Sequence, residues 1–220
     1  MQKQEKDLLR SCARDYGVTL TTPQIDLINI YLQELWEWNK KINLAGLSSR
    51  KRVLKELLLD SLIPSPYLPE EGDLLDVGSG AGFPAVPLKI LSPGLRMHLM
   101  EARSKRVSFL KQVTRITNLY DMEIIRGRIE KDKGLLRPEG YDIITARALA
   151  DLTRTLTWCA PHLKTGGLIL TFKGSRLEKV LKQGSDVIHG HGLVLYKAVP
   201  YRLPGKDAIR HLLIFRKDRS

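Results

Sequence analysis

Residues 74–84 read LLDVGSGAGFP, a short apolar segment that runs directly into a glycine-rich loop. In an open α/β sheet, ligands bind beyond the carboxyl end of the first strand, where the strand order reverses. Glycines at that point let the chain turn tightly and let the backbone approach a ligand closely. The stretch therefore predicts the first strand of such a sheet, followed by a binding loop in which Gly78 and Gly80 contact the ligand.

The spacing of the glycines limits the choice of ligand. A phosphate-binding P-loop would end in Gly-Lys-Ser or Gly-Lys-Thr, which this loop lacks. A dinucleotide loop needs Gly-x-Gly-x-x-Gly, but the third position is Phe83 when counted from Gly78 and Ala85 when counted from Gly80. Asp76, just before the glycines, would repel a pyrophosphate but can attract the sulfonium and amino groups of S-adenosylmethionine. A purely structural turn remains the alternative.

An acidic residue follows the next predicted strand. Glu101 ends the apolar run at 97–100, about 20 residues past the loop, where an acid can accept hydrogen bonds from both ribose hydroxyls of an adenosine. Ala102 follows it and is included in the predicted cofactor site. The alternative for Glu101 is a solvated acid at a strand end.

Three later segments place polar residues at strand ends. Ile129 and Glu130 follow the apolar pair at 124–125, where backbone and side chain would frame an adenine edge. Arg147 follows the run at 141–146 and suits a cofactor carboxylate or an RNA phosphate, because its guanidinium can donate two parallel hydrogen bonds. Lys173 ends a further strand and is either a phosphate ligand or a surface lysine.

The periodicity predicts an α/β fold with a mainly parallel sheet and helices on both faces, preceded by a helical segment. Prolines 64, 66 and 69 and Gly72 interrupt the pattern. We place the boundary there, giving a helical segment at 1–66 and a ligand-binding domain at 67–220. The expected helices are 23–38, 49–62, 84–91, 105–117, 152–163 and 177–188. The expected strands are 74–77, 96–101, 122–126, 141–146, 168–173, 193–199 and 210–216.

Charge and composition indicate the class of partner. The 220 residues include 36 Lys and Arg against 24 Asp and Glu, a net charge of +12, which favours a polyanion such as a nucleic acid. A basic protein without such a partner is the alternative. No apolar run is long enough to cross a membrane, and the two cysteines, Cys12 and Cys159, suggest neither a disulfide framework nor a metal site. We expect a cytoplasmic protein without metal; the oligomeric state is left open.

The residues present also bear on the methyl acceptor. Attack through pyrimidine C5 needs a cysteine beside a proline, a setting that neither cysteine has. An exocyclic adenine amine is usually handled by an Asn/Asp-Pro-Pro-aromatic loop after the fourth strand, where this chain has Thr-Ala-Arg-Ala-Leu. Guanine N7 carries an in-plane lone pair and needs no base, so positioning alone can serve it.

Together, several segments resemble the bacterial RsmG (GidB) methyltransferases over residues from about 20 to 215. The resemblance implies a class I methyltransferase (Rossmann-like) fold and S-adenosylmethionine-dependent methylation of one guanine N7 in 16S ribosomal RNA, free or in the small ribosomal subunit. The segments are LLDVGSGAGFP at 74–84, EARSKRVSFL at 101–110, RIE at 128–130, ARALA at 146–150, KG at 173–174, WNKKINL at 38–44 and LDSL at 59–62.

The resemblance also assigns residues. It implies cofactor contacts at the matching Gly78, Phe83, Ile129, Glu130 and Arg147, with Glu101 on the ribose. From the helical segment, it implies that three residues face the substrate: Asn39, Lys40 and Asn43.

Two positions depart from the family pattern. Ala45 stands where members usually have threonine, and Leu57 where they often have histidine, which leaves the role of Asp60 open. Trp36 lies on the apolar stripe of the helix at 23–38 and is expected in the core, whereas Trp38 lies off it and is open to either interpretation.

Two other function classes compete with the methyltransferase. One is a non-catalytic RNA-binding module with a vestigial cofactor pocket. The other is a nicotinamide oxidoreductase, which the count of glycines disfavours. Binding of S-adenosylmethionine or of NADH distinguishes these classes.

Overall fold

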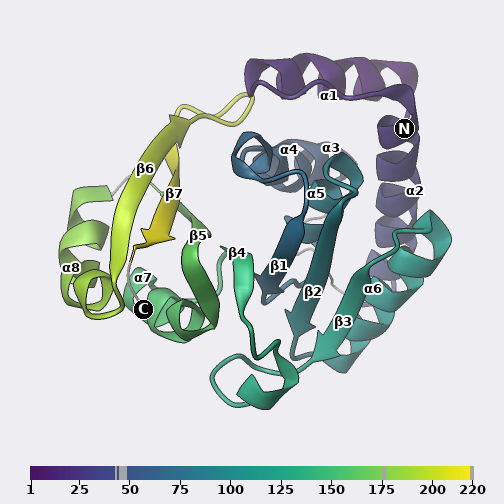
Figure 1. The fold of residues 1–220 in the computed structure, drawn as a ribbon. Coiled ribbons are helices and arrows are strands. Elements are labelled where there is room, and N and C mark those ends of the chain that lie inside the picture. The colour runs from purple at the N-terminus through teal and green to yellow at the C-terminus, as the bar shows by residue number, and fades with distance from the viewer. Residues whose placement is uncertain (43, 45–48, 175–176, 219–220) are drawn as a thin grey trace.

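A computed structural model of the chain describes residues 1–42, 44, 49–174 and 177–218. Within these residues, seven strands form one sheet in the order β3-β2-β1-β4-β5-β7-β6 (Figure 1). The strands from β3 to β5 are parallel, and β7 runs antiparallel to both of its neighbours. This is the predicted mainly parallel sheet. The strands are β1 (Gly72–Val77), β2 (Leu95–Glu101), β3 (Met122–Arg126), β4 (Tyr141–Ala146), β5 (Leu163–Lys173), β6 (Leu193–Tyr201) and β7 (Arg210–Lys217).

Helices cover both faces of the sheet, as predicted. Successive residues of a strand point to opposite faces, so Leu74 packs into one core with α5 and α6, and Leu75 packs into the other with α7 and α8. The helices are α1 (Lys3–Asp15), α2 (Thr22–Asn39), α3 (Arg50–Arg52), α4 (Leu59–Leu62), α5 (Ala85–Leu91), α6 (Ser104–Thr117), α7 (Leu152–Cys159) and α8 (Leu177–Gly190).

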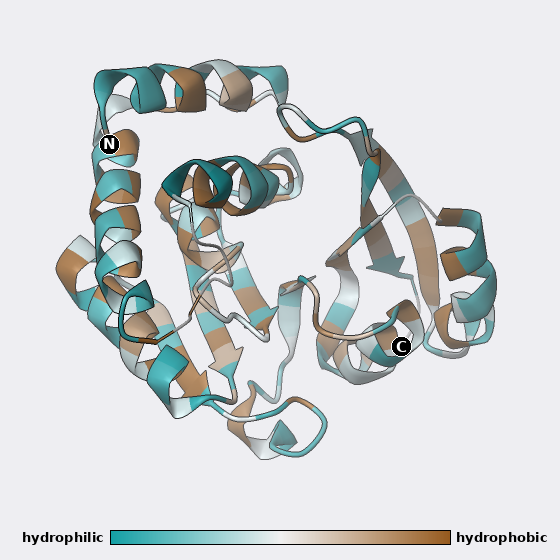
Figure 2. Ribbon diagram, turned by 180° about the vertical axis from the view of Figure 1, so that it is seen from behind, coloured by the Kyte–Doolittle hydropathy of each residue, from teal (hydrophilic) through white to brown (hydrophobic). Residues whose placement is uncertain are grey.

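The helical segment before the sheet includes α1, α2 and a further helical stretch that ends with α4. The helix expected at 23–38 is α2, which Thr21 caps by accepting a hydrogen bond from the Gln24 amide. The helix expected at 49–62 is built from α3, a π-helical stretch η1 (Val53–Leu58) and α4. The sequence placed residues 1–15 in the helical segment without separating α1 from it. Figure 2 shows hydrophobic and hydrophilic residues interleaved along α1 and α2, as in helices that bury one side.

The helical segment shares its core with the sheet. Leu9 of α1, Ile28 of α2 and Leu58 of η1 are fully buried in the same cluster as Leu74 of β1. The helical segment and the sheet are therefore packed into one body. The domain boundary between residues 66 and 67 remains a prediction from the sequence. Trp36, expected in the core, is half-buried, with the Arg50 guanidinium 5.9 Å from its ring centroid.

Because the helical segment and the sheet share one core, a cavity made in that core should destabilise the whole protein. We expect Leu58→Ala to lower the free energy of unfolding by about 2–5 kcal/mol, because the side chain is completely buried and its neighbours can close the gap only in part. Chemical denaturation followed by circular dichroism measures this. Leu135→Ala is the matched control, because Leu135 is 54% exposed. A loss no larger than in this control would show that η1 does not support the core.

Candidate functional site

The loop after β1 turns tightly at its glycines and is held against β2. Gly78, Gly80 and Gly82 have φ values of 73°, 59° and 91°, which residues with a Cβ rarely adopt. The amides of Gly78 and Ser79 both donate to the Met100 carbonyl, at 2.9 and 3.2 Å. A Cβ at Gly82 would lie 2.7 Å from the Val86 side chain. The loop therefore requires glycine for its angles and for its close packing.

Glu101 is buried beneath this loop. Its Oε2 accepts a hydrogen bond from the Gly80 amide at 2.9 Å, and its Oε1 accepts one from the Arg103 amide at 2.8 Å. A carboxylate offers about four lone-pair sites, so each oxygen retains capacity for a ligand hydroxyl. The acid at the end of β2 is thus held by the backbone in a fixed orientation, which suits a pair of ribose hydroxyls.

Asp76 lies deeper than the loop that it precedes. Its Oδ1 accepts a hydrogen bond from the Thr145 hydroxyl at 2.6 Å, while its Oδ2 is buried without a hydrogen-bond partner among the described residues. Burial raises the pKa of this carboxyl, and the Thr145 hydrogen bond opposes the shift only in part. Asp76 lines neither of the two cavities described next, so direct contact with a cofactor remains a prediction for it.

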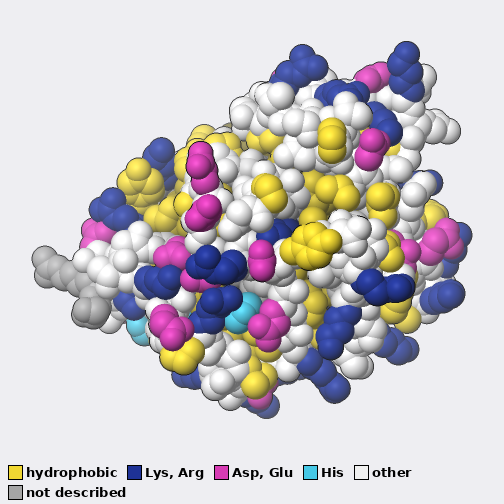
Figure 3. Space-filling view, turned by 45° about the vertical axis from the view of Figure 1, so that its right-hand side comes forward, with side chains coloured by type: hydrophobic (Ala, Val, Ile, Leu, Met, Phe, Trp, Pro, Cys, Tyr) yellow, Lys and Arg dark blue, Asp and Glu magenta, His cyan; other side chains and the backbone are white. Residues whose placement is uncertain are grey.

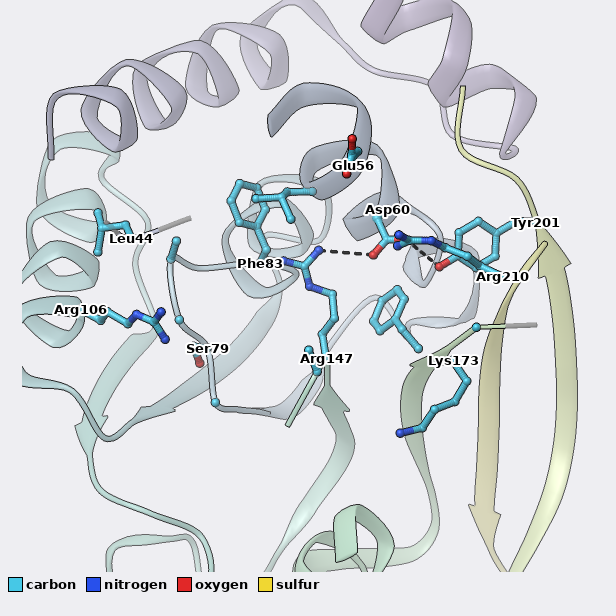
Figure 4. A pocket seen from close by; sticks show the side chains of 17 residues that line it. Leu44, Glu56, Asp60, Ser79, Phe83, Arg106, Arg147, Lys173, Tyr201 and Arg210 are labelled. Carbon is cyan, nitrogen blue, oxygen red and sulfur yellow. Dashed lines mark hydrogen bonds and ion pairs between the residues drawn. The ribbon is translucent and has the colours of Figure 1, made fainter. Parts of the chain in front are cut away.

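Two cavities meet at Gly78, at the carboxyl ends of the parallel strands. The smaller has a volume of about 170 Å³ and lies beyond β1, β2 and β3. The larger has a volume of about 570 Å³ and opens between the loop, the helical segment and the β6–β7 hairpin (Figure 4). The smaller is lined by Val77, Gly78, Met100, Glu101, Ala102, Gly127, Arg128, Ile129, Glu130, Leu149 and Trp158. The larger is lined by Leu44, Glu56, Leu57, Asp60, Gly78, Ser79, Gly80, Ala81, Phe83, Arg106, Arg147, Ala148, Phe172, Lys173, Gly174, Tyr201 and Arg210.

Arg147 stands on the wall of the larger cavity between the glycine loop and α4. Its Nη1 lies 3.3 Å from Asp60 Oδ2, and its guanidinium carbon lies 5.4 Å from the centroid of the Phe83 ring. Asp60 is almost wholly buried, and its Oδ1 accepts hydrogen bonds from the Tyr201 hydroxyl at 2.6 Å and from Arg210 Nη1 at 3.2 Å. Burial together with the Asp60 charge raises the pKa of Tyr201, so this hydroxyl stays protonated and donates. One carboxylate therefore joins β4, β6 and β7 to the helical segment.

The structure brings most of the predicted cofactor residues to these cavities. The smaller cavity holds Glu101, Ala102, Ile129 and Glu130, the larger holds Gly80, Phe83 and Arg147, and Gly78 lines both.

The predicted substrate residues are less clustered. Lys173 lines the larger cavity and donates to the Ala150 carbonyl at 3.2 Å, and burial lowers its pKa. Lys40 instead pairs with Glu37 on the exposed side of α2, at 2.8 Å. Asn39 accepts a hydrogen bond from the Leu44 amide, and neither Asn39 nor Lys40 is among the described residues that line these two cavities. Asn43 and Ala45 lie outside the described residues.

Several residues of the site carry no signal in the local sequence. Tyr31 is fully buried in α2, donates to the Ala81 carbonyl at 2.6 Å and packs against Phe83, with ring centroids 5.3 Å apart. Tyr201 and Arg210 reach the larger cavity from the last two strands. Asp60 lies in the LDSL segment, but the sequence assigned it no role. These contacts depend on the tertiary fold.

The described residues contain no helix with the length and apolar character to span a membrane. Within the same residues, no group of three or more His, Cys, Asp or Glu side chains is placed to hold a metal ion.

Comparison with known proteins gives consistent matches. The GidB family model, described as rRNA small subunit methyltransferase G, matches residues 24–209. A relative named Ribosomal RNA small subunit methyltransferase G, from Alkaliphilus oremlandii, is 37% identical over 216 residues, covering 96% of this chain and 90% of the relative. Another of the same name, from Syntrophus aciditrophicus, is 34% identical over 219 residues, covering 97% and 90%.

The fold also resembles that of a solved methyltransferase. The crystal structure of ribosomal protein L11 methylase from Lactobacillus delbrueckii subsp. bulgaricus matches with a TM-score of 0.56 at 16% identity, covering 78% of this chain and 81% of that one. This likeness concerns the fold alone.

The Tyr31 hydroxyl of α2 supports the glycine loop, so its removal should affect both the loop and the cofactor that the loop binds. Tyr31→Phe leaves the Ala81 carbonyl without its buried donor, which costs about 1–3 kcal/mol. We expect a lower free energy of unfolding and weaker binding of S-adenosylhomocysteine in calorimetry. Tyr120→Phe is the control, because Tyr120 is 76% exposed. Unchanged binding and stability in Tyr31→Phe would mean that α2 does not set the loop.

Proposed function

This chain belongs to the GidB family of small-subunit rRNA methyltransferases, and we propose that it transfers the methyl group of S-adenosylmethionine to guanine N7 of one nucleotide in 16S ribosomal RNA. The observation that carries the proposal is the pair of cavities that meet at Gly78, one suited to an adenosine and one large enough to admit a second ligand. We also propose a cytoplasmic location, where ribosomal subunits are found.

The residues of the smaller cavity fit an adenosine. Glu101 would accept hydrogen bonds from the ribose hydroxyls, because its two oxygens are already oriented by backbone amides. Ile129 and Glu130 would border the adenine, and Trp158 adds an aromatic side chain to the lining of the same cavity. A Cβ at Gly78 would lie 3.1 Å from Leu149, another residue of this cavity, so glycine lets these two lining residues pack closely.

The larger cavity suits the amino-acid tail of the cofactor and the acceptor base. Arg147 would bind the cofactor carboxylate, and the loop amides would border the sulfonium. The cofactor, when bound, supplies a methyl group on a positively charged sulfur that a lone pair can attack in line.

The acceptor needs little chemical assistance from this cavity. Both acids that line it are already engaged, Asp60 by two arginines and Glu56 by Arg52 and Lys206. Guanine N7 loses no proton on methylation, so such a site can act by holding the base in line with the methyl group, which can lower the barrier by about 7–11 kcal/mol when the alignment is good. This agreement supports N7 over acceptors that need a general base.

The competing function is a non-catalytic RNA-binding module with a vestigial cofactor pocket. The intact glycine loop and the buried, oriented Glu101 argue against it, because a vestigial pocket would have no need to retain glycine at each positive-φ position or a desolvated acid. Family membership points the same way.

Methyl transfer is the direct test. Wild-type protein with tritiated S-adenosylmethionine is expected to label 16S rRNA in small ribosomal subunits, and chemical cleavage at N7-methylguanosine is expected to give one site. Glu101→Gln should bind the cofactor about tenfold or more weakly, because it removes the charge from hydrogen bonds to the ribose. Glu123→Gln is a matched control, because the Glu123 side chain is 68% exposed. Binding of S-adenosylmethionine without any transfer to subunits or free rRNA would favour the RNA-binding module.

A further inference from the structure

The larger cavity carries an excess of positive charge. Four cationic side chains line it, against the two acids Glu56 and Asp60. The negative charge of Glu56 is compensated by Arg52 and Lys206, and neither of these two residues lines the cavity. On the face in Figure 3, lysine and arginine side chains are spread among acidic ones. The four cations are Arg106, Arg147, Lys173 and Arg210.

The cofactor does not relieve this excess. S-adenosylmethionine carries a sulfonium, an ammonium and one carboxylate, so its net charge is +1. When it binds, the cavity becomes more positive, because the carboxylate compensates only one arginine. A second, anionic ligand is therefore favoured electrostatically in the same space.

The four cations differ in how far they are already engaged. Arg106 lies 3.8 Å from Glu101 and belongs to the cofactor side. Arg147 is 17% exposed and packs on Phe83, and Lys173 donates to a backbone carbonyl. Arg210 is 40% exposed and uses Nη1 toward Asp60, with no other hydrogen bond from its guanidinium among the described residues.

The position of Arg210 separates it from the cofactor. It is the first residue of β7, and of the two cavities it lines only the larger one. Figure 4 shows it on the Asp60 and Tyr201 side, across the cavity from Ser79 and Arg106. Asp60 holds one edge of its guanidinium and is itself held by the Tyr201 hydroxyl, which leaves the remaining N–H groups for a ligand.

We propose that Arg210 binds a phosphodiester of the RNA beside the target nucleotide, and that Asp60 and Tyr201 are positioning residues that orient it. The proposal rests on the function proposed above and deepens it. A guanidinium is suited to this task because its planar fork matches two phosphate oxygens. Binding of the phosphate would place the neighbouring base within the larger cavity.

Salt-dependent binding tests the proposal. Small ribosomal subunits are titrated with wild type and Arg210→Gln at several potassium chloride concentrations, and S-adenosylmethionine binding is measured separately. We expect Arg210→Gln to weaken subunit binding about tenfold and to make the slope of log K against log salt shallower by about 1. Cofactor affinity should not fall below that of wild type. Lys111→Gln removes one exposed charge from α6 and should change neither the affinity for subunits, nor its salt slope, nor the affinity for the cofactor.

Two further results decide the outcome. Arg210→Lys retains the charge but loses the fork, so we expect the wild-type salt slope and an affinity between those of wild type and Arg210→Gln; this variant carries the test if Arg210→Gln does not fold. Equal salt slopes for Arg210→Gln and wild type, or equal losses of subunit and cofactor binding, would overturn the assignment. Absence of methyl transfer by the wild type in the same preparation would instead overturn the function proposed above.

Discussion

The carboxylate of Glu101 is the constraint on which the site depends. It accepts hydrogen bonds from the Gly80 amide in the loop and from the Arg103 amide just before α6, so the glycine loop and the start of α6 are both fixed to the end of β2. The group that is suited to a ribose is therefore also the group that shapes the loop. Such a carboxylate is desolvated before the ligand arrives and needs no reorientation, which reduces the cost of binding.

Asp60 performs a comparable role on the opposite wall. Its partners Arg147, Tyr201 and Arg210 are 87, 141 and 150 residues further along the chain. A carboxylate this deeply buried is stable only when its oxygens are satisfied, and removal of one partner leaves an uncompensated charge that costs several kcal/mol. The width of the larger cavity is thus set by an interaction among the helical segment, β4 and the closing hairpin. This interaction, together with the common core, makes the helical segment an integral part of the site.

The sequence predicted the parts of the site that depend on local pattern. Residues that end parallel strands, such as Glu101 and Arg147, are brought to one edge by the topology alone, and the bounds of β3 and β4 follow from their apolar runs. The roles of Tyr31 and Arg210 in the site were not predicted, because the sequence around each residue does not indicate the distant residue that it contacts. The helix expected at 152–163 ends at Cys159, and the strand expected at 168 begins at Leu163, because the strand accommodates Gly166 at a φ of 80°.

The distribution of charge suggests how the two ligands affect each other. A cofactor of net charge +1 enters a cavity that is already positive, so its affinity must come from the adenosine half, where Glu101 provides hydrogen bonds and negative charge. A phosphate bound at the far wall would lower the local potential and favour the cofactor, and by thermodynamic linkage the cofactor would favour the RNA equally. In the proposed reaction the guanine gains a positive charge on N7 while the sulfur loses its own. The methylated base then faces the same cations with less attraction than before, which favours its release.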